Sequence, residues 1–561
     1  MNEERGLPRV GVFVCRCGVN IGGFLDTAAV VEYAKTLPGV VFAKENLYSC
    51  SESGTTEIKK GIQENNLQRV VVASCTPLTH EPLFRAICQE VGVNPYLFEF
   101  VNIREHCSWA HMKQREEATE KAKDLIRMGV ARATKLEPLE PIEAEVEPSA
   151  LVIGGGIAGL AAAATLAERA FRVALVEREG ELGGMLRHLY KLYPSNVMAG
   201  EFLKLWRDRV TNNPLIDIYL ASEVISVKGF IGNYDVIIRS PEKETPLKTG
   251  VIIVATGAQL WEPPEGLYGY NSKDVITQLE LEGLLKKGKL KGDRVVMIQC
   301  VGAMSPERSY CSRICCVTAI KNAILIKEMN PAATVHILYR QLQAYGDEYE
   351  AYLRRGKEMG VRLVNFSPER SPVVEDHQVK VYHQLLGREL TLPFDLLVLS
   401  TPLVSQRGSE ALATLLKVPI DQDGFFLEAH IKLRPLEFAT DGIYLCGCAH
   451  YPADVGEAVS QALGAVSRAS IHLTKGYIKV EPIVSSIDEK LCQGCGLCAG
   501  LCPYGAIEMV DTPEGRKAKV ITVACKGCGI CASSCYCRAI IISHYTNEQL
   551  EAQIRAFRSA G

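Results

Sequence analysis

The segment SALVIGGGIAGLAAAATLAERAFRVALVERE (residues 149–179) decides the fold of the central part of the chain. It has the order strand, glycine-rich turn, helix and second strand, and Gly154, Gly156 and Gly159 form a G-x-G-x-x-G pattern at the turn. In that context the pattern is typical of a Rossmann unit that binds a pyrophosphate at the helix N-terminus. Glu177, at the end of the second strand, is expected to accept hydrogen bonds from a ribose. The alternative is a Rossmann unit that has lost its ligand.

Three further features favour FAD over NAD as the dinucleotide. A glycine pair follows the acidic strand, the segment Ala255-Thr256-Gly257 ends another strand, and a distal strand at Ile443–Gly447 leads into a helix. The N-terminus of that helix would direct its positive dipole end at a flavin ring. The residues predicted to hold FAD are Gly154, Gly156, Ile157, Ala158, Gly159, Glu177, Gly183, Gly184, Met185, Ala255, Thr256, Gly257 and Gly447.

A second nucleotide-binding-like unit interrupts this flavin domain, but its phosphate loop is missing. The strand Asp293–Gln299 leads into Cys300, Cys311, Cys315 and Cys316, where an NAD(P)-binding enzyme would have another glycine-rich turn. These four cysteines can converge on one cluster, and a disulfide within the group is the main alternative. Lys321 lies on the helix expected after them; by spacing alone it is either a solvated surface residue or a catalytic one.

Near the C-terminus two cysteine runs have the spacing C-x2-C-x2-C-x3-C, which is typical of two 4Fe-4S clusters. In such modules the fourth cysteine of each run binds the other cluster. The expected ligand sets are Cys492, Cys495, Cys498 and Cys535 for one cluster, and Cys525, Cys528, Cys531 and Cys502 for the other. A zinc ribbon is disfavoured because zinc sites use paired C-x2-C units; a disulfide framework is the other alternative. Tyr536 stands where the second run would usually have proline.

The first part of the chain alternates apolar runs with helical stretches, which predicts a small parallel α/β domain. Cysteines follow each predicted strand, and the carboxyl ends of parallel strands lie at one edge of a sheet. The five cysteines placed there are Cys15, Cys17, Cys50, Cys75 and Cys107. A cubane needs four of them, so a further 4Fe-4S cluster is one interpretation, and a set of buried structural thiols is the other. Cys88 has helical spacing and is expected in the core.

These segments predict an α/β fold of the thioredoxin-reductase-like two-dinucleotide type, with an N-terminal parallel α/β domain and a C-terminal 2[4Fe-4S] ferredoxin-like domain. A linker rich in proline and glutamate is expected over residues 137–148. The predicted domains are 1–136 (cluster-binding α/β domain), 149–290 (FAD domain, first part), 291–400 (NAD-domain-like unit with a cluster motif), 401–478 (FAD domain, return part) and 480–545 (ferredoxin-like domain).

Composition limits the classes of function. The 561 residues carry a net charge of −3 without a basic patch, which argues against nucleic-acid binding. The start of the chain has no apolar signal region, and the longest apolar helix candidate, 157–167, is about half of what a bilayer crossing needs. Twenty-one cysteines without a secretion signal indicate reduced thiolates for metal or redox use. The sequence therefore predicts a cytoplasmic protein without a transmembrane segment.

Four strings together with the terminal cysteine runs resemble the heterodisulfide reductase HdrA family, the flavin-bearing A subunits of complexes in methanogens and related anaerobes. They are VGVFVCRCGVNIGG, CTPLTHEPLFR, NPYLFEFVNIREHCSWAH and QCVGAMSPERSYCSRICC. The resemblance covers nearly the whole chain. It implies an oxidoreductase with FAD and 4Fe-4S clusters, two in the C-terminal domain and two more, in which the flavin takes electron pairs and sends electrons singly along two paths.

The resemblance also implies site residues and partners. It places a cluster on positions matching Cys300, Cys311, Cys315 and Cys316, and a lysine matching Lys321 beside flavin N5. The implied partners are the B and C subunits of heterodisulfide reductase or their homologues, a hydrogenase, formate dehydrogenase or NADH-linked subunit, and ferredoxin, around a homodimeric core. Longer members of the family insert a ferredoxin-like module after the glycine pair, whereas 185–216 contains no cysteine here. The chain thus resembles a short form that lacks one of the two electron exits, which favours electron relay over electron bifurcation.

Two other functions remain possible at the level of sequence. A stand-alone NAD(P)H:ferredoxin oxidoreductase is the first, although the missing glycine turn at Cys300 speaks against it. A scaffold subunit whose clusters only conduct electrons between partners is the second.

Overall fold

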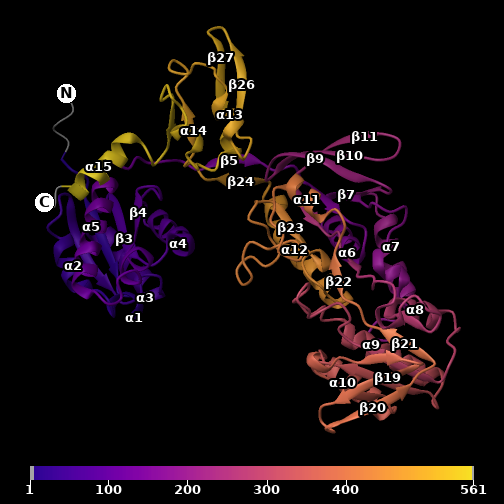
Figure 1. Cartoon of the computed structure of the whole chain (residues 1–561). Helices are drawn as coiled ribbons and strands as arrows, with labels where there is room; N and C mark the ends of the chain where they lie inside the picture. The colour runs from indigo at the N-terminus through magenta and orange to yellow at the C-terminus, as the bar shows by residue number, and fades with distance from the viewer. Residues whose placement is uncertain (1–5, 559–561) are drawn as a thin grey trace. The chain divides into compact units, whose positions relative to one another are not determined.

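The computed structural model describes residues 6–558 and divides into two compact units (Figure 1). The first unit comprises Met1–Glu143 and Lys479–Gly561, and the second comprises Ala144–Ile478. The N-terminal α/β domain and the module with the two cysteine runs, from opposite ends of the chain, therefore belong to one unit.

The first unit begins with a four-stranded parallel sheet of order β2-β1-β3-β4. Its strands are β1 (Val10–Cys15), β2 (Val40–Asn46), β3 (Arg69–Ser74) and β4 (Phe98–Asn102). Its helices are α1 (Val19–Gly22), α2 (Thr27–Ala34), α3 (Glu52–Glu64), α4 (Pro77–Glu90), the π-helical turn η1 (Arg104–Ser108) and α5 (Arg115–Ala133). Strand side chains alternate between two apolar cores, one shared with α2 and α5 and the other with α3 and α4. The predicted parallel α/β domain thus has helices on both faces.

The C-terminal part of this unit is built from short elements. Its strands are β25 (Ser485–Ile487), β26 (Ile507–Thr512), β27 (Gly515–Val520) and β28 (Ile540–Ile542). Its helices are α13 (Leu497–Leu501), the 3-10 turn η6 (Thr522–Ala524), α14 (Ile530–Ser533) and α15 (Asn547–Arg558). β25 pairs with β28 and β26 with β27, both antiparallel. The small core includes cysteines of both runs, so the cluster sites and the fold of the module depend on one another.

The second unit contains two domains of the same architecture. The strands are β6 (Ser149–Ile153), β7 (Arg172–Val176), β8 (Ile216–Tyr219), β9 (Glu223–Phe230), β10 (Asn233–Arg239), β11 (Glu244–Thr249), β12 (Val251–Val254), β13 (Ala258–Leu260), β14 (Val275–Thr277), β15 (Arg294–Ile298), β16 (Thr334–Tyr339), β17 (Arg362–Asn365), β18 (Val373–Glu375), β19 (Gln378–His383), β20 (Arg388–Pro393), β21 (Leu396–Leu399), β22 (Leu403–Ser405) and β23 (Ile443–Leu445). The helices are α6 (Ile157–Glu168), α7 (Ala199–Thr211), α8 (Gln278–Lys286), α9 (Cys315–Met329), α10 (Asp347–Glu358), α11 (Ser409–Leu416) and α12 (Val455–Lys475). Short 3-10 turns are η2 (Gly184–His188), η3 (Leu267–Gly269), η4 (Pro368–Arg370) and η5 (Gly447–Ala449).

Each of these domains has a five-stranded parallel sheet, in the orders β23-β12-β6-β7-β8 and β14-β21-β15-β16-β17. A three-stranded antiparallel sheet packs on one face of each, β9–β11 in the first domain and β18–β20 in the second. In the second domain α8, α9 and α10 cover the opposite face. The chain enters the second domain from the first and returns for β23, which joins the sheet of the first domain, and for α12.

Two local features differ from the expectations. The segment expected as a linker contains a short strand, β5 (Ile142–Glu145), because apolar and acidic side chains alternate there; another short strand, β24 (Tyr477–Val480), follows α12. The second domain also begins before the boundary predicted at residue 290, since β14 pairs with β21. A capping box between Thr277 and Glu280 then starts α8 directly after β14.

A buried ion pair holds the two parts of the first unit together. The Arg132 guanidinium in α5 pairs with the Glu99 carboxylate in β4 and donates to the backbone carbonyl of His544. The His544 ring in turn lies 2.6 Å from the Tyr96 backbone oxygen through Nε2. Less than a tenth of the surface of each residue is exposed. If one partner were removed, water could therefore not solvate the remaining charge.

We expect Arg132→Met to lower the free energy of unfolding of the first unit by about 3–5 kcal/mol, because it leaves the Glu99 carboxylate buried and unpaired. Lys135→Met is the control. It removes a half-exposed pair with Glu548 in the same region and should cost less than about 1 kcal/mol. Thermal unfolding followed by circular dichroism compares the two variants, and equal losses of stability would contradict the structural role given to Arg132.

Candidate functional site

A cavity of about 860 Å³ runs through the second unit and is lined by both of its domains. From the first domain come the turn between β6 and α6, the end of β12, the turn η2 and the start of α12. From the second domain come residues of α8 and α9 and the segment after β21. A volume in this range is typical of sites for large organic ligands.

The three glycines of the turn have different roles. Gly154 has φ +111°, and a Cβ there would lie 2.3 Å from the Ala255 backbone oxygen. A Cβ on Gly159 would lie 1.8 Å from the Gly154 oxygen, so α6 can approach the turn only with glycine at this position. A Cβ on Gly156, in contrast, would meet no protein atom within 4 Å, and Gly156 lines the cavity. Gly156 is therefore a glycine that the protein's own packing does not require, as expected where a ligand approaches the backbone.

The acidic strand end is held against this turn. Glu177 accepts hydrogen bonds through Oε2 from the Gly155 N–H at 2.6 Å and through Oε1 from the Glu179 N–H at 2.8 Å. The carboxylate lines the cavity beside the α6 N-terminus. This arrangement fits the ribose and pyrophosphate of a dinucleotide.

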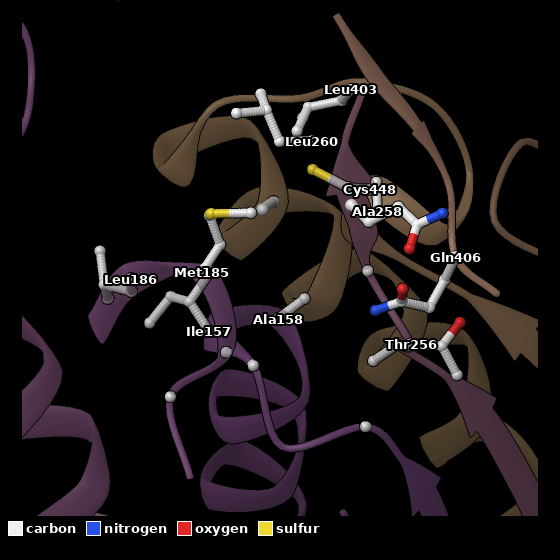
Figure 2. A pocket seen from close by; sticks show the side chains of 18 of the residues that line it. Ile157, Ala158, Met185, Leu186, Thr256, Ala258, Leu260, Leu403, Gln406 and Cys448 are labelled. Atoms are coloured by element: carbon white, nitrogen blue, oxygen red, sulfur yellow. The ribbon is translucent and has the colours of Figure 1, made fainter. Parts of the chain in front are cut away.

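Apolar and polar side chains face one another across the middle of the cavity. Figure 2 shows Ile157 and Met185 on one side and Thr256 and Gln406 on the other. The Thr256 hydroxyl is buried and has no hydrogen-bond partner among the described residues. An orphaned hydroxyl at the wall of an apolar cavity fits a ligand that carries hydrogen-bonding groups along its length.

Most residues predicted to hold the dinucleotide line this cavity. They are Gly154, Gly156, Ile157, Ala158, Glu177, Gly183, Gly184, Met185, Ala255, Thr256, Gly257 and Lys321. Two of the predicted residues are packing positions instead. Gly159 supports the helix, and Gly447, with φ +66°, donates its N–H to Gln461 at 3.0 Å next to Ala158. The helix α12 begins after η5, and its N-cap Asp454 lines the cavity.

Lys321 also lines the cavity and is almost completely buried. Its ammonium group forms an ion pair with Glu282 of α8 and donates to the Lys191 backbone oxygen at 3.0 Å. The second carboxylate oxygen of Glu282 accepts from the Tyr190 N–H at 2.8 Å. Burial by itself lowers the pKa of Lys321 to about 7, and the Glu282 carboxylate opposes this by stabilising the ammonium form. Whether Lys321 on the cavity wall carries a positive charge thus depends on the balance between its burial and the Glu282 carboxylate.

The four cysteines of the second domain gather at the end of β15 and the start of α9. Cys300 has φ +60°, and Cys315 and Cys316 form the first turn of the helix. The thiols of Cys300, Cys311 and Cys316 all lie close enough to Cys315 to interact electrostatically with it. Burial, more than these neighbours, raises the pKa of Cys315 to about 12. Four thiols in such a place suit a cationic metal centre, which displaces their protons on binding.

This group borders the same cavity. Cys315 lines it together with Thr318 and Lys321, which lie three and six residues further along α9. A cluster on the four thiols would therefore be next to a ligand in the cavity, with Cys315 between them.

The two C-terminal cysteine runs form two separate hollows. One is lined by Cys492, Cys495, Cys498 and Cys535 together with Cys537, and the other by Cys502, Cys525, Cys528 and Cys531. The structure thus brings together the interlocked ligand sets that the spacing predicts. Backbone N–H groups point at the crossing ligands: Ala506 donates to Cys502 at 3.3 Å and Ala539 to Cys535 at 3.4 Å.

In the N-terminal domain the structure brings together four of the five predicted thiols. Cys17 and Cys50 each interact electrostatically with Cys15 and Cys75, at the carboxyl ends of β1 and β3. Cys107 lies apart from them. Its thiol donates to the Ala118 backbone oxygen at 2.9 Å, and it belongs to the apolar core beside α5. Cys88 is completely buried in α4, as the helical spacing predicts.

Across residues 6–558, no group of three Cys, His, Asp or Glu side chains is arranged as ligands of a single metal ion. In a cubane each thiolate binds a different iron, so its ligands lie further apart than those of one ion. None of the described helices is both long and apolar enough to cross a membrane.

Three residues of these sites were not predicted from the sequence. Glu282 is the partner of Lys321, Cys448 lines the cavity, and Cys537 lines a cluster hollow. Glu282 had no local signal, whereas Cys448 follows the predicted Gly447 and Cys537 follows the predicted Cys535 by two residues.

Two family models match the chain. The pyridine nucleotide-disulphide oxidoreductase family matches residues 148–462, and the 4Fe-4S binding domain matches residues 486–508. An iron-sulfur A subunit of CoB–CoM heterodisulfide reductase from Methanopyrus kandleri is 39% identical over 91% of this chain and 92% of the relative. The chain belongs to the HdrA family of heterodisulfide reductase subunits.

Other relatives agree with this assignment. The A subunit of the H2:CoB–CoM heterodisulfide, ferredoxin reductase from Methanothermobacter marburgensis is 38% identical over 98% of this chain and 97% of the relative. That alignment extends over 647 positions, although the chain has 561 residues, so the relative has segments without a counterpart here. Among solved structures, thioredoxin reductase of T. acidophilum covers 58% of this chain and 97% of its own length, with a TM-score of 0.41 and 20% identity. The family models confirm the predicted class of oxidoreductase, with a flavin-type domain and a 4Fe-4S domain.

Substitutions at two glycines separate ligand binding from folding. We expect Gly156→Val to fold like the wild type but to purify with less than about a tenth of the flavin, because its side chain fills the cavity where the ligand approaches. Gly159→Val should instead destabilise the second unit, because its side chain meets the Gly154 backbone. Flavin absorbance per chain and thermal unfolding measure the two effects. Full flavin content in folded Gly156→Val would contradict the proposed position of the ligand.

Proposed function

We propose that this chain is the FAD- and 4Fe-4S-containing electron-transfer subunit of a heterodisulfide-reductase-type complex. The observation that carries this proposal is one continuous cavity, which reaches from the glycine turn at Gly156 to Cys315 of the four-thiol group and Lys321. FAD bound there would take electrons in pairs and release them singly. A 4Fe-4S cluster held by the four thiols would accept single electrons directly beside it.

The residues of the chain supply the binding and the electrostatics. The α6 N-terminus and Glu177 would hold the pyrophosphate and ribose, and the apolar side chains Ile157 and Met185 would exclude water from the middle of the cavity. The Lys321 ammonium would stabilise negative charge on the ring, while Glu282 limits the size of that effect. The flavin potential would therefore depend on this pair.

The remaining clusters would connect the flavin with partners. We assign one 4Fe-4S cluster to Cys300, Cys311, Cys315 and Cys316, two to the C-terminal runs and one to Cys15, Cys17, Cys50 and Cys75. Relatives are named for CoB–CoM heterodisulfide and, in several cases, also for H2 and ferredoxin. By analogy, the partners of this chain would be the B and C subunits or their homologues, a hydrogenase, formate or NADH-linked donor, and ferredoxin, around a homodimeric core. Twenty-one cysteines suit a reducing cytoplasm.

Electron relay is the simpler form of this function. The Methanothermobacter marburgensis relative has segments without a counterpart in this chain, and the segment after the glycine pair forms η2 and α7 without a cysteine. Bifurcation would need two electron paths away from the flavin, and both would have to use the four cluster sites assigned above. Electron bifurcation, or the reverse reaction in which two electron paths join at the flavin, would support two paths if it were measured in the complex with ferredoxin.

The number of clusters tests the assignment. Anaerobically reconstituted protein should contain about 16 iron atoms per FAD if all four sites hold a 4Fe-4S cluster. About 8 would leave only the C-terminal clusters, and the proposed electron path from the flavin through Cys315 would be wrong. Rapid flavin reduction by NAD(P)H in the isolated chain would instead favour a stand-alone NAD(P)H:ferredoxin oxidoreductase.

Charge changes at the buried pair test the role of Lys321. We expect Lys321→Met to lower the two-electron flavin potential by on the order of 30–60 mV, because the reduced ring loses a nearby cation; 30 mV corresponds to about 1.4 kcal/mol. Glu282→Gln should raise the potential at low pH, where Lys321 still carries a proton; burial lowers the pKa of this lysine, and loss of the carboxylate lowers it further. As the pH rises the lysine becomes neutral, and the potential should fall toward that of Lys321→Met.

Spectroelectrochemical titration at several pH values measures these potentials, with the surface variant Lys327→Met on the same helix as the control. Potentials unchanged in both Lys321→Met and Glu282→Gln would exclude the pair from the flavin site.

A further inference from the structure

The two cluster hollows of the C-terminal module differ in their number of thiols. The hollow with the first three cysteines of the first run is lined by a fifth thiol, Cys537, in addition to the expected fourth ligand Cys535. The described residues that line the other hollow include four thiols and no more. A fifth thiol is not required by the C-x2-C-x2-C-x3-C pattern.

Cys537 is close to the expected ligand. The Sγ atoms of Cys535 and Cys537 lie 3.5 Å apart, and both side chains border the same hollow. Neither is completely buried, so each thiol has room to change its rotamer. A shift of a few ångströms would thus exchange one sulfur for the other at the same corner of a cluster.

The equivalent place in the other half of the module is built differently. There the crossing ligand Cys502 is followed by Pro503 and Tyr504, whereas Cys535 is followed by Tyr536 and Cys537. Both ligands accept a backbone N–H from the residue four positions later, which shows that the two corners correspond. Proline fixes φ after Cys502, while Tyr536 leaves the backbone free to adjust. Among the described residues, the second thiol and a turn without proline therefore occur together at the Cys535 corner.

We propose that Cys535 and Cys537 are interchangeable fourth ligands of the cluster held by Cys492, Cys495 and Cys498. This proposal rests on the proposed function, because it assumes that the module holds 4Fe-4S clusters. In the exchange one iron–sulfur bond breaks as another forms, and the proton released by the entering thiol is taken up by the departing thiolate. No electron is transferred, so the exchange needs no oxidant or reductant.

The consequence is a cluster with two ligation states. The two states differ in which backbone N–H groups reach the fourth sulfur, since Ala539 donates to Cys535, whereas both Ala539 and Gln493 reach Cys537. Hydrogen bonds to the ligand sulfurs are one determinant of the potential of a cluster. The cluster would also persist if one of the two thiols were oxidised or alkylated.

Single substitutions at both corners test the exchange in the full-length, anaerobically reconstituted protein. Cys535→Ala should retain the iron and sulfide content of the wild type and the electron paramagnetic resonance signals of both reduced C-terminal clusters. Cys537→Ala should retain them as well. The double variant Cys535→Ala/Cys537→Ala should lose one cluster, or about four iron atoms per chain. The matched control Cys502→Ala, where Tyr504 replaces the second thiol, should lose one cluster as a single variant.

Alkylation gives a second measurement that does not depend on metal counts. In the wild type one of the two thiols stays outside the cluster, so iodoacetamide should label some loaded chains at Cys535 and others at Cys537. In Cys535→Ala the remaining thiol, Cys537, should be protected until the iron is removed with a chelator. Mass spectrometry of the peptide that contains Tyr536 distinguishes the two cases.

Loss of a cluster in Cys535→Ala, equal to that in the double variant or in Cys502→Ala, would overturn the exchange, as would labelling of Cys537 in loaded Cys535→Ala. Failure of Cys535→Ala to fold while Cys537→Ala folds would also overturn it, because the remaining thiol should complete the site. A wild-type module without any cluster would instead overturn the proposed function.

Discussion

The carboxyl edge of a parallel sheet is the constraint on which all sites outside the ferredoxin-like module depend. Strands that run in one direction end at one edge, and the segments that follow them meet there. Cys75 follows β3, Gly154 follows β6 and Cys300 comes two residues after β15. In each of the three parallel sheets this edge gathers residues that lie far apart in the sequence. The same geometric constraint therefore accounts for the position of all three candidate ligand sites, at Cys75, Gly154 and Cys300.

Within the second unit, the edges of two sheets border one cavity, and the buried Lys321 also lines it. Lys321 is tolerated there because Glu282 and the Lys191 carbonyl satisfy its ammonium group. The ion pair links α8 and α9 of the second domain. Lys191, in contrast, belongs to the first domain, where it follows the glycine pair Gly183-Gly184. A hydrophobic pair of the same volume would stabilise the fold as well or better, so stability alone does not explain the charges at this position.

The sequence alone predicts those sites whose residues lie at short, fixed spacings along the chain. The glycine turn at Gly154, Gly156 and Gly159 and the interlocked cysteine runs depend on fixed spacings, so their structural environment follows from local sequence. Glu282 could not be found in this way, because its partner is thirty-nine residues away on another helix. The different placement of Cys107 depends on the π-helical turn η1, which directs the thiol to Ala118 rather than to the sheet edge. Spacing identifies ligands within a run, whereas convergence of distant residues requires the fold.

Equal spacing does not make the two C-terminal cluster sites equivalent. Both runs have the same pattern, so ligand number and type alone would give the two clusters similar potentials. The residues around them break this symmetry. Ser485 places its N–H and its hydroxyl 3.4 Å from the Cys525 sulfur in one site, while the other site has the Cys537 thiol 3.5 Å from Cys535. Because hydrogen bonds to the sulfurs raise or lower the potential, these neighbours, rather than the cysteine spacing, would set the direction in which an electron passes between the two clusters.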